Sequence, residues 1–195
     1  MAAGRDVAVI NTVPVSGFGW LQRDGSEQLA GELPGYSQFA VSYLPQPWPG
    51  RLGEMFDQRQ LDALRALAVA EQDKPLRAAH LAHGDLDVTH IYAHVGRYSG
   101  IIDFGEMRGT DRYFDLGHFL LHDGETRPAR LFSFFLDGYR QPDRHGQAIR
   151  VSAILLGLRQ LSRWISPQRD YPLSHPLVQR RVAELSNLIA GKSAG

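Results

Sequence analysis

The segment His83–Glu106, HGDLDVTHIYAHVGRYSGIIDFGE, most constrains what this chain can fold into. It places acidic residues and a histidine at the ends of short apolar runs. The runs HIYAHV and YSGIID predict two antiparallel strands joined by a Gly-Arg turn. Because a hairpin returns the chain, Asp103 is expected beside the start of the first strand, near His90 and Asp85. This grouping suits a base, Asp85, that orients a hydroxyl group beside a divalent-metal site held by His90 and Asp103.

The composition excludes several classes of protein. The chain has 195 residues, with 21 basic and 21 acidic side chains, so it carries no net charge to attract nucleic acid or an anionic membrane. It has no cysteine, which excludes disulfides, thiolate zinc sites and cysteine nucleophiles. No apolar stretch approaches the roughly 20 residues of a membrane span, and the N-terminal apolar run is too short for a signal peptide. We therefore expect a cytoplasmic protein that binds neither nucleic acid nor membranes.

The pattern along the chain predicts a small β element on a helical body, within one domain over residues 1–195. Residues 1–55 are rich in Gly and Pro and predict loops with one short helix over 36–44. Residues 58–125 are expected to contain a helix over 58–72 and the acid-bearing segment, and residues 126–195 the helical body. The strands are expected at 80–82, 90–95 and 98–103. Further helices are expected at 113–123, 129–140, 149–165 and 176–191, with Gly138, Pro142, Pro167 and Gly191 near their ends.

The motifs of this segment carry a resemblance to a known family. His-Gly-Asp-Leu, a metal ligand five positions after the Asp, and then Ile-Asp-Phe-Gly resemble the catalytic and metal loops of protein kinases. The His-Gly-Asp form is similar to the aminoglycoside phosphotransferase family of small-molecule kinases. The stretch DRYFDLGHF that follows resembles the Asp-x-x-x-Asp-Leu-Ala segment of that family. The specific part of the resemblance spans about His83 to Phe119.

The resemblance implies an α+β fold equivalent to the kinase-like C-terminal lobe, mostly helical, with a small hairpin carrying both loops. It implies transfer of the γ-phosphate of ATP, or of another nucleoside triphosphate, to a hydroxyl group of a small molecule. Asp85 would orient the hydroxyl group, and Asp103 would bind the Mg²⁺ that bridges the phosphates. His83 and Asp115 would support the catalytic loop. Residues that border the site and could touch substrate are Glu106, Arg108 and Asp111.

The sequence departs from the family pattern in two ways. The family usually has Asn where this chain has His90. Because imidazole is a better ligand for ions softer than Mg²⁺, Mn²⁺ is an alternative metal. No Gly-rich phosphate loop precedes the motifs, and the one VAIK-like string ends in Asn11. The only lysines are Lys74 and Lys192, neither of which is placed to hold the nucleotide phosphates. We therefore expect the N-terminal lobe to be absent from this chain, and a separately encoded lobe is a candidate partner.

Two other functions stay open. The chain could be a catalytically inactive kinase-like remnant that binds metal or substrate without transferring phosphate. It could also be a metal-dependent hydrolase that uses a cluster of histidines, namely His80, His83, His90 and His94. His118 and His122 stand four residues apart but lack the Glu of a zinc-protease motif, and we interpret them as core or surface histidines. The acidic residues Glu106, Asp111, Asp123 and Glu125 indicate either a solvated surface or an acidic pocket for an amine-bearing substrate.

Overall fold

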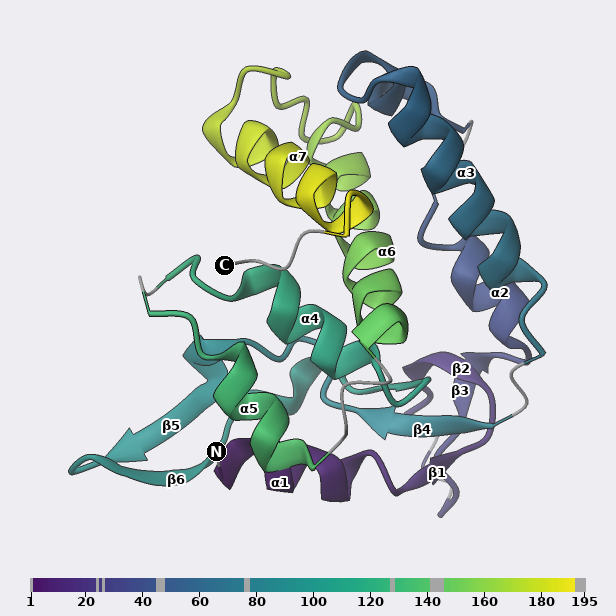
Figure 1. The fold of residues 1–195 in the computed structure, drawn as a ribbon. Coiled ribbons are helices and arrows are strands. Elements are labelled where there is room, and N and C mark those ends of the chain that lie inside the picture. Colours follow the sequence, from purple (N-terminus) through teal and green to yellow (C-terminus); the bar gives the residue numbers. More distant parts are fainter. Residues whose placement is uncertain are drawn as a thin grey trace. The chain divides into compact units, whose positions relative to one another are not determined.

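The computed structural model describes residues 2–23, 25, 27–44, 48–75, 78–126, 129–140 and 146–191. Its elements are shown in Figure 1. The α-helices are α1 Ala2–Ile10, α2 Tyr36–Val41, α3 Gln58–Gln72, α4 Phe114–His122, α5 Phe132–Tyr139, α6 Gly146–Trp164 and α7 Pro176–Ile189. The 3₁₀ helices are η1 Gly50–Glu54, η2 Val88–His90 and η3 Phe104–Glu106. The strands are β1 Pro14–Val15, β2 Phe18–Leu21, β3 Gly31–Leu33, β4 Ala79–Ala82, β5 Ile91–His94, β6 Arg97–Ile101 and β7 Arg108–Thr110. The predicted α+β class is confirmed.

The chain divides into two compact units. The first comprises Met1–Tyr36 and Pro75–Ala153, and the second comprises Ser37–Lys74 and Ile154–Gly195. Within the described ranges, the first unit contains every strand and all the residues singled out for the site. The prediction of a single domain over residues 1–195 stays a prediction. None of the helices in the described part of the chain combines the length and the hydrophobicity that crossing a membrane requires.

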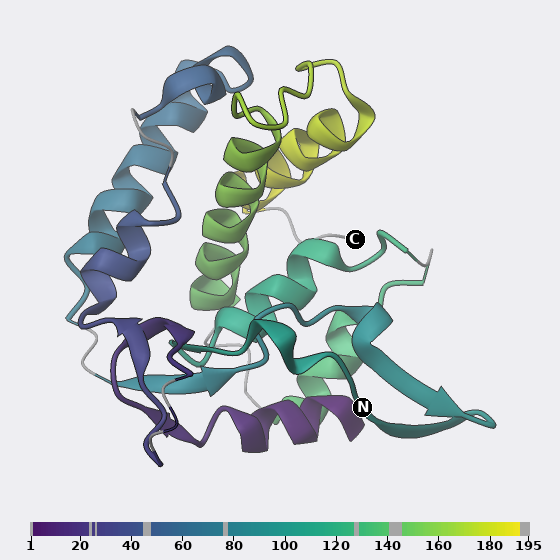
Figure 2. The same cartoon turned by 180° about the vertical axis from the view of Figure 1, so that it is seen from behind.

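The first unit contains two sheets. The larger has the strand order β1-β4-β7-β2-β3, with its named strand pairs all antiparallel. The smaller is the predicted hairpin of β5 and β6, in which Ile91 pairs with Ile101. Its turn places Val95 and Gly96 at positive φ, so the turn begins one residue before the predicted Gly-Arg pair. Figure 2 shows the hairpin reaching away from the helices of this unit.

The prediction that residues 1–55 are mostly loop is wrong, although the expected helix near residue 36 is present. The segment forms α1, the three strands β1 to β3 and the 3₁₀ helix η1. The glycines of this segment look like turn residues in the sequence, and Gly17 and Gly19 do have positive φ. The strands of the segment form by pairing with distant partners, since Trp20 lies opposite Arg108 of β7. That partner cannot be identified from the local pattern.

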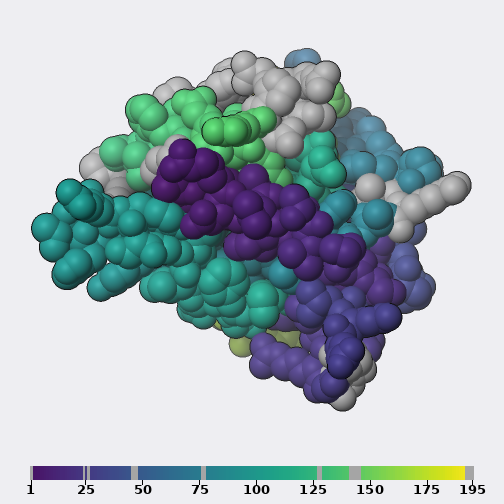
Figure 3. Space-filling view, turned by 90° about the horizontal axis from the view of Figure 1, so that it is seen from below, coloured from purple at the N-terminus to yellow at the C-terminus, as the bar shows by residue number. Residues whose placement is uncertain are grey.

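Helix α1 packs closely against α5. A Cβ atom on Gly4 would lie 2.1 Å from the carbonyl oxygen of Phe135 and 2.7 Å from the backbone nitrogen of Tyr139. Ala3 and Val7 are buried in the same core, together with Phe119 of α4. In Figure 3, α1 lies at the surface between the hairpin and α5. The helix therefore depends on tertiary packing, because a glycine in a helix interior disfavours the helix by itself.

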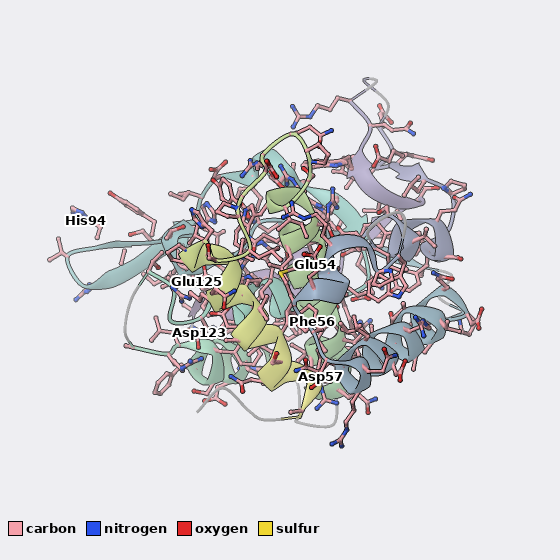
Figure 4. The ribbon with its side chains drawn as sticks, turned by 90° about the horizontal axis from the view of Figure 1, so that it is seen from above. Glu54, Phe56, Asp57, His94, Asp123 and Glu125 are labelled. Carbon is pink, nitrogen blue, oxygen red and sulfur yellow. The ribbon has the colours of Figure 1, made fainter. Side chains whose placement is uncertain are left out.

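The second unit is helical. Helix α3 spans the predicted residues because Asp57 caps it: its Oδ1 accepts from Gln60 N at 2.8 Å, and Gln60 Oε1 accepts from Asp57 N at 3.0 Å. Figure 4 shows Asp57 at the start of this helix. Gln60 also donates to Ser186 Oγ of α7 at 3.0 Å. The predicted helices of the C-terminal half are confirmed within a few residues; Pro142 lies outside the described residues.

We predict that Gly4→Ala destabilises the protein, because the added methyl group would force α1 away from the backbone of α5. Overpacking of this kind costs about 1–3 kcal/mol, which exceeds the gain of about 1 kcal/mol in helix propensity. Gly146→Ala is the matched control, since its added Cβ meets nothing within 4 Å. Urea unfolding followed by circular dichroism measures both variants. Equal stability of the two would contradict the close packing of α1.

Candidate active site

The loop after β4 is held in place by hydrogen bonds to one buried carboxylate. Asp115, in the first turn of α4, is fully buried. Its Oδ2 accepts from His83 N at 2.9 Å, and its Oδ1 accepts from Gly84 N at 3.0 Å. Asn11 Nδ2 donates to Oδ2 at 3.2 Å. Asp115 thus has the contacts that bracing of the loop requires, and Asn11, which ends the VAIK-like string, is part of the same network.

Only glycine fits at position 84 of this loop. Its φ is +93°, a conformation that disfavours side chains. A Cβ atom there would also lie 1.9 Å from the carbonyl oxygen of Glu106 and 2.8 Å from Arg108 Nε. The loop therefore touches the segment that follows Asp103, and the His-Gly-Asp form of the motif follows from this close approach.

Asp85 lies at the surface of this loop, whereas the residue after it is anchored. Leu86 is fully buried in the core of the unit. The side chain of Asp85 is 45% exposed, and its Oδ1 lies 3.2 Å from His118 Nε2. The hydrogen bond from His118 holds the pKa of Asp85 below its ordinary value, against the opposing effect of partial burial. Asp85 is therefore an accessible carboxylate at neutral pH.

His83 joins the two acid-bearing loops. Its ring is buried; Nδ1 accepts from Asp85 N at 3.4 Å, and Nε2 donates to the carbonyl oxygen of Ile102 at 2.9 Å. The ring also packs on Phe104, with 4.8 Å between the ring centroids. One nitrogen accepting and the other donating defines a neutral ring. These contacts suit a supporting role for His83 rather than a chemical one.

His90 and Asp103 come together as the hairpin register requires. Ile102 N donates to the carbonyl oxygen of His90 at 3.0 Å, and His90 Nε2 lies 3.8 Å from Asp103 Oδ2. Asp103 has φ +65°, in the left-handed region that Asp tolerates better than most residues. Its side chain is 69% exposed. Strained backbone at an exposed acid is a frequent property of functional sites.

These two side chains fit a divalent ion as a partial ligand set. A carboxylate oxygen and an imidazole nitrogen 3.8 Å apart are too far apart for a hydrogen bond but can face one ion. Across the described ranges, no group of three or more His, Asp or Glu side chains is placed to hold a metal ion by itself. The remaining ligand positions would fall to phosphate oxygens and water, as is usual for Mg²⁺.

The histidine cluster of the hydrolase alternative does not assemble into a metal site. His80 lies on β4 of the larger sheet, where burial lowers its pKa. His94 lies near the tip of the hairpin, as Figure 4 shows, and is exposed. The described residues therefore offer the zinc-hydrolase alternative no protein-only metal centre.

The three residues expected to border the substrate differ in accessibility. The side chain of Arg108 is 5% exposed; it donates to Glu106 Oε2 at 2.7 Å and lies 4.2 Å from the ring centroid of Trp20. Asp111 is buried and accepts from Tyr36 Oη at 3.4 Å and from Tyr113 N at 2.7 Å. Glu106 keeps 48% of its side chain exposed. Of the three, Glu106 has the accessibility that a contact with substrate requires.

Two of the four acids expected to form an acidic pocket make internal contacts instead. Asp111 is buried by internal contacts, and Asp123 accepts from Leu131 N at 2.8 Å and from Phe132 N at 3.1 Å. Asp123 thereby satisfies backbone donors at the start of α5. Figure 4 shows Asp123 and Glu125 in the segment after α4. Asp111 and Asp123 therefore organise the fold rather than line a common pocket.

His118 is the residue of the site that sequence reasoning missed. We interpreted it with His122 as a core or surface histidine, whereas it contacts Asp85. The spacing could have revealed it, because Asp115 and His118 stand three residues apart and share a helix face. If one of them braces the 83–86 loop, the other also faces that loop.

Solved structures share this fold. The crystal structure of aminoglycoside phosphotransferase APH(4)-Ia matches with a TM-score of 0.64 at 17% identity, covering 98% of this chain and 62% of that chain. A thermostable mutant of the same enzyme, in ternary complex with ADP and hygromycin B, matches with a TM-score of 0.63 at 17% identity, covering 97% of this chain and 62% of that chain. At these identities the likeness shows the fold, which is the protein-kinase-like fold of small-molecule phosphotransferases. This chain spans about 62% of the length of those structures.

The sequence itself matches a family model. The model of the phosphotransferase enzyme family, APH, matches residues 25–149, a range that includes both acid-bearing loops and α4. The chain therefore belongs to the phosphotransferase enzyme family, as the resemblance of its motifs predicted. No curated protein matches the sequence.

We predict that Gly84→Ala destabilises the protein far more than Gly96→Ala does. Both glycines have positive φ, so each substitution costs about 1–2 kcal/mol of backbone strain. Only at Gly84 does the added methyl group also collide with backbone, because Gly96 has open space around it. Thermal unfolding of the two variants measures the difference. Equal losses would show that the loop does not approach Glu106 as closely as described.

Proposed function

We propose that this protein transfers the γ-phosphate of a nucleoside triphosphate, with ATP as the first candidate, to a hydroxyl group of a small molecule. The family supports a phosphotransferase, and one feature of the site carries the proposal. An accessible carboxylate at Asp85 and an exposed carboxylate at Asp103 belong to two loops that the buried ring of His83 joins. The matched enzyme forms complexes with ADP or AMP-PNP and hygromycin B, which supports a nucleotide and a small-molecule acceptor.

The proposed mechanism consists of positioning and charge neutralisation. Asp85 orients the acceptor hydroxyl group toward the γ-phosphorus. Asp103 and His90 would hold the divalent cation, Mg²⁺ or Mn²⁺, which when bound neutralises phosphate charge. His83 and Asp115 keep the two loops in place, and Glu106 contacts the acceptor. The proposed setting is the cytoplasm.

Binding of the nucleotide is proposed to involve groups outside these motifs. The first unit contains no lysine, since the two lysines are Lys74 and Lys192. Lys74 forms an ion pair with Glu71 at 3.3 Å, and Lys192 lies outside the described residues. The prediction of a separately encoded N-terminal lobe as a partner stays a prediction.

We predict that Asp103→Asn weakens binding of the Mg²⁺–ATP complex by at least about 10-fold, because a metal ligand loses its charge. Asn tolerates the left-handed backbone at this position, so the fold should be retained. Isothermal titration of the chain with Mg²⁺–ATP measures the change, and Asp62→Asn, an exposed acid on α3, is the matched control. Equal affinity in Asp103→Asn and wild type would remove Asp103 from the metal site.

We predict that Asp85→Asn lowers kcat by about 10²–10⁴-fold while leaving nucleotide affinity nearly unchanged, because Asp85 acts on the acceptor hydroxyl group. Transfer of labelled γ-phosphate to hygromycin B and to a panel of hydroxyl-bearing small molecules measures turnover. Full turnover in Asp85→Asn would contradict the proposed role. Nucleotide binding by the wild type without transfer to any acceptor would favour the non-catalytic binding module instead.

A further inference from the structure

His118 makes two contacts that leave its ring no freedom. The side chain is 9% exposed and lies on α4. Its Nδ1 lies 2.9 Å from the carbonyl oxygen of Leu86, and its Nε2 lies 3.2 Å from Asp85 Oδ1. Behind it, α4 is pressed close to α6, because a Cβ atom on Gly117 would lie 2.5 Å from the Cβ atom of Ser152. The ring is therefore fixed between two consecutive residues of the catalytic loop.

The chemistry of these contacts determines where the protons lie. A carbonyl oxygen only accepts, so the contact with Leu86 places a proton on Nδ1. If Nε2 then carried a lone pair, it would face a carboxylate oxygen, and two acceptors at 3.2 Å would repel each other. The pair with Asp85 therefore holds one additional proton. A carboxylate oxygen that accepts at this contact leaves that proton on Nε2 of the ring.

The other charged groups around the pair leave this assignment in place. The charges of His90 on η2 and of His122 on α4 act in the same direction as His118 and lower the pKa of Asp85. On α4, the ring of His122 stacks on that of His118 with 4.3 Å between centroids, and its Nδ1 donates to the carbonyl oxygen of His118 at 2.9 Å. That donation places a proton on Nδ1 of His122, whose ring is inclined by 29° to that of His118. Asp85 is the carboxylate that contacts His118.

We infer that His118 is a positioning residue that binds Oδ1 of Asp85 as an imidazolium and so presents the other carboxylate oxygen, Oδ2, to the acceptor hydroxyl group. This inference rests on the proposed role of Asp85. When the acceptor oxygen bonds to the γ-phosphorus and the bond to the departing nucleoside diphosphate breaks, the acceptor proton passes to Oδ2 and then to solvent. His118 keeps both of its protons throughout.

The first test needs no turnover. Long-range ¹H–¹⁵N spectra of the ¹⁵N-labelled chain at neutral pH should show protons on both ring nitrogens of His118, identified by the signals that His118→Gln removes. In Asp85→Asn the proton on Nε2 should be lost, because the new amide can donate to a neutral ring. The exposed His94 serves as the internal reference. A neutral His118 ring in the wild type would overturn the inference.

The second test measures the reaction. We predict that His118→Ala lowers kcat by about 10- to 100-fold through misplacement of the carboxylate, with an unchanged KM for the nucleotide. Removing the donor also removes the largest cause of the lowered pKa of Asp85, so the loss of activity on acidification should begin at a higher pH than in the wild type. His118→Gln, whose amide can still donate, should recover most of kcat, and His94→Ala should leave activity unchanged.

The outcomes separate this inference from the function on which it rests. An active Asp85→Asn variant would remove the proposed function itself. An inactive Asp85→Asn together with a fully active His118→Ala, whose acid limb is unshifted, would overturn only the role of His118. If His118→Ala does not fold, the spectra of the wild type and Asp85→Asn still decide the question.

Discussion

The buried carboxyl group of Asp115 is the interaction on which the rest of the first unit depends. A carboxylate out of contact with water is costly unless hydrogen bonds satisfy it, and losing such partners costs several kcal/mol. Here its donors come from the loop after β4, through His83 N and Gly84 N, and from the residue that follows α1, Asn11. Asn11 in turn accepts from Tyr139 Oη at 2.9 Å. Segments far apart in the sequence are thus joined around one charge.

The contacts of this network determine which of its groups donate hydrogen bonds and which accept them. Burial, with the negative charge of Asp115 as the next cause, raises the pKa of Tyr139 above its ordinary range, so the phenol remains a donor. Asn11 Oδ1 accepts the hydrogen bond from Tyr139, and Asn11 Nδ2 donates hydrogen bonds to Leu81 O and Asp115 Oδ2. The neighbours of each group in the network determine whether it donates or accepts. A satisfied polar network of this kind specifies a single arrangement of the loop above it.

The sequence predicted the elements whose signals are local. Helix α3 has its capping residue and a following Pro75, and the hairpin has two apolar runs that pair with each other. It did not predict α1 or the strands β1 to β3, since these depend on partners far along the chain. Gly4 disfavours a helix until α5 lies against it. The candidate site followed the same rule: the motifs predict roles for Asp85 and Asp103 that stay predictions, whereas the contact between His118 and Asp85 depends on the fold.

The pairing of Asp85 with a cationic ring bears on how such a site can work. A carboxylate that accepts a hydrogen bond from His118 is a weaker base than a free one, because its pKa is lowered. Phosphoryl transfer does not require a strong base to deprotonate the acceptor hydroxyl group. In a loose transition state, the attacking oxygen forms little bond to phosphorus before the leaving group departs. What the step needs is an acceptor held in line, and an oxygen fixed by its partner holds it more rigidly than a freely rotating carboxylate. The weak base and the fixed geometry are therefore two consequences of one contact.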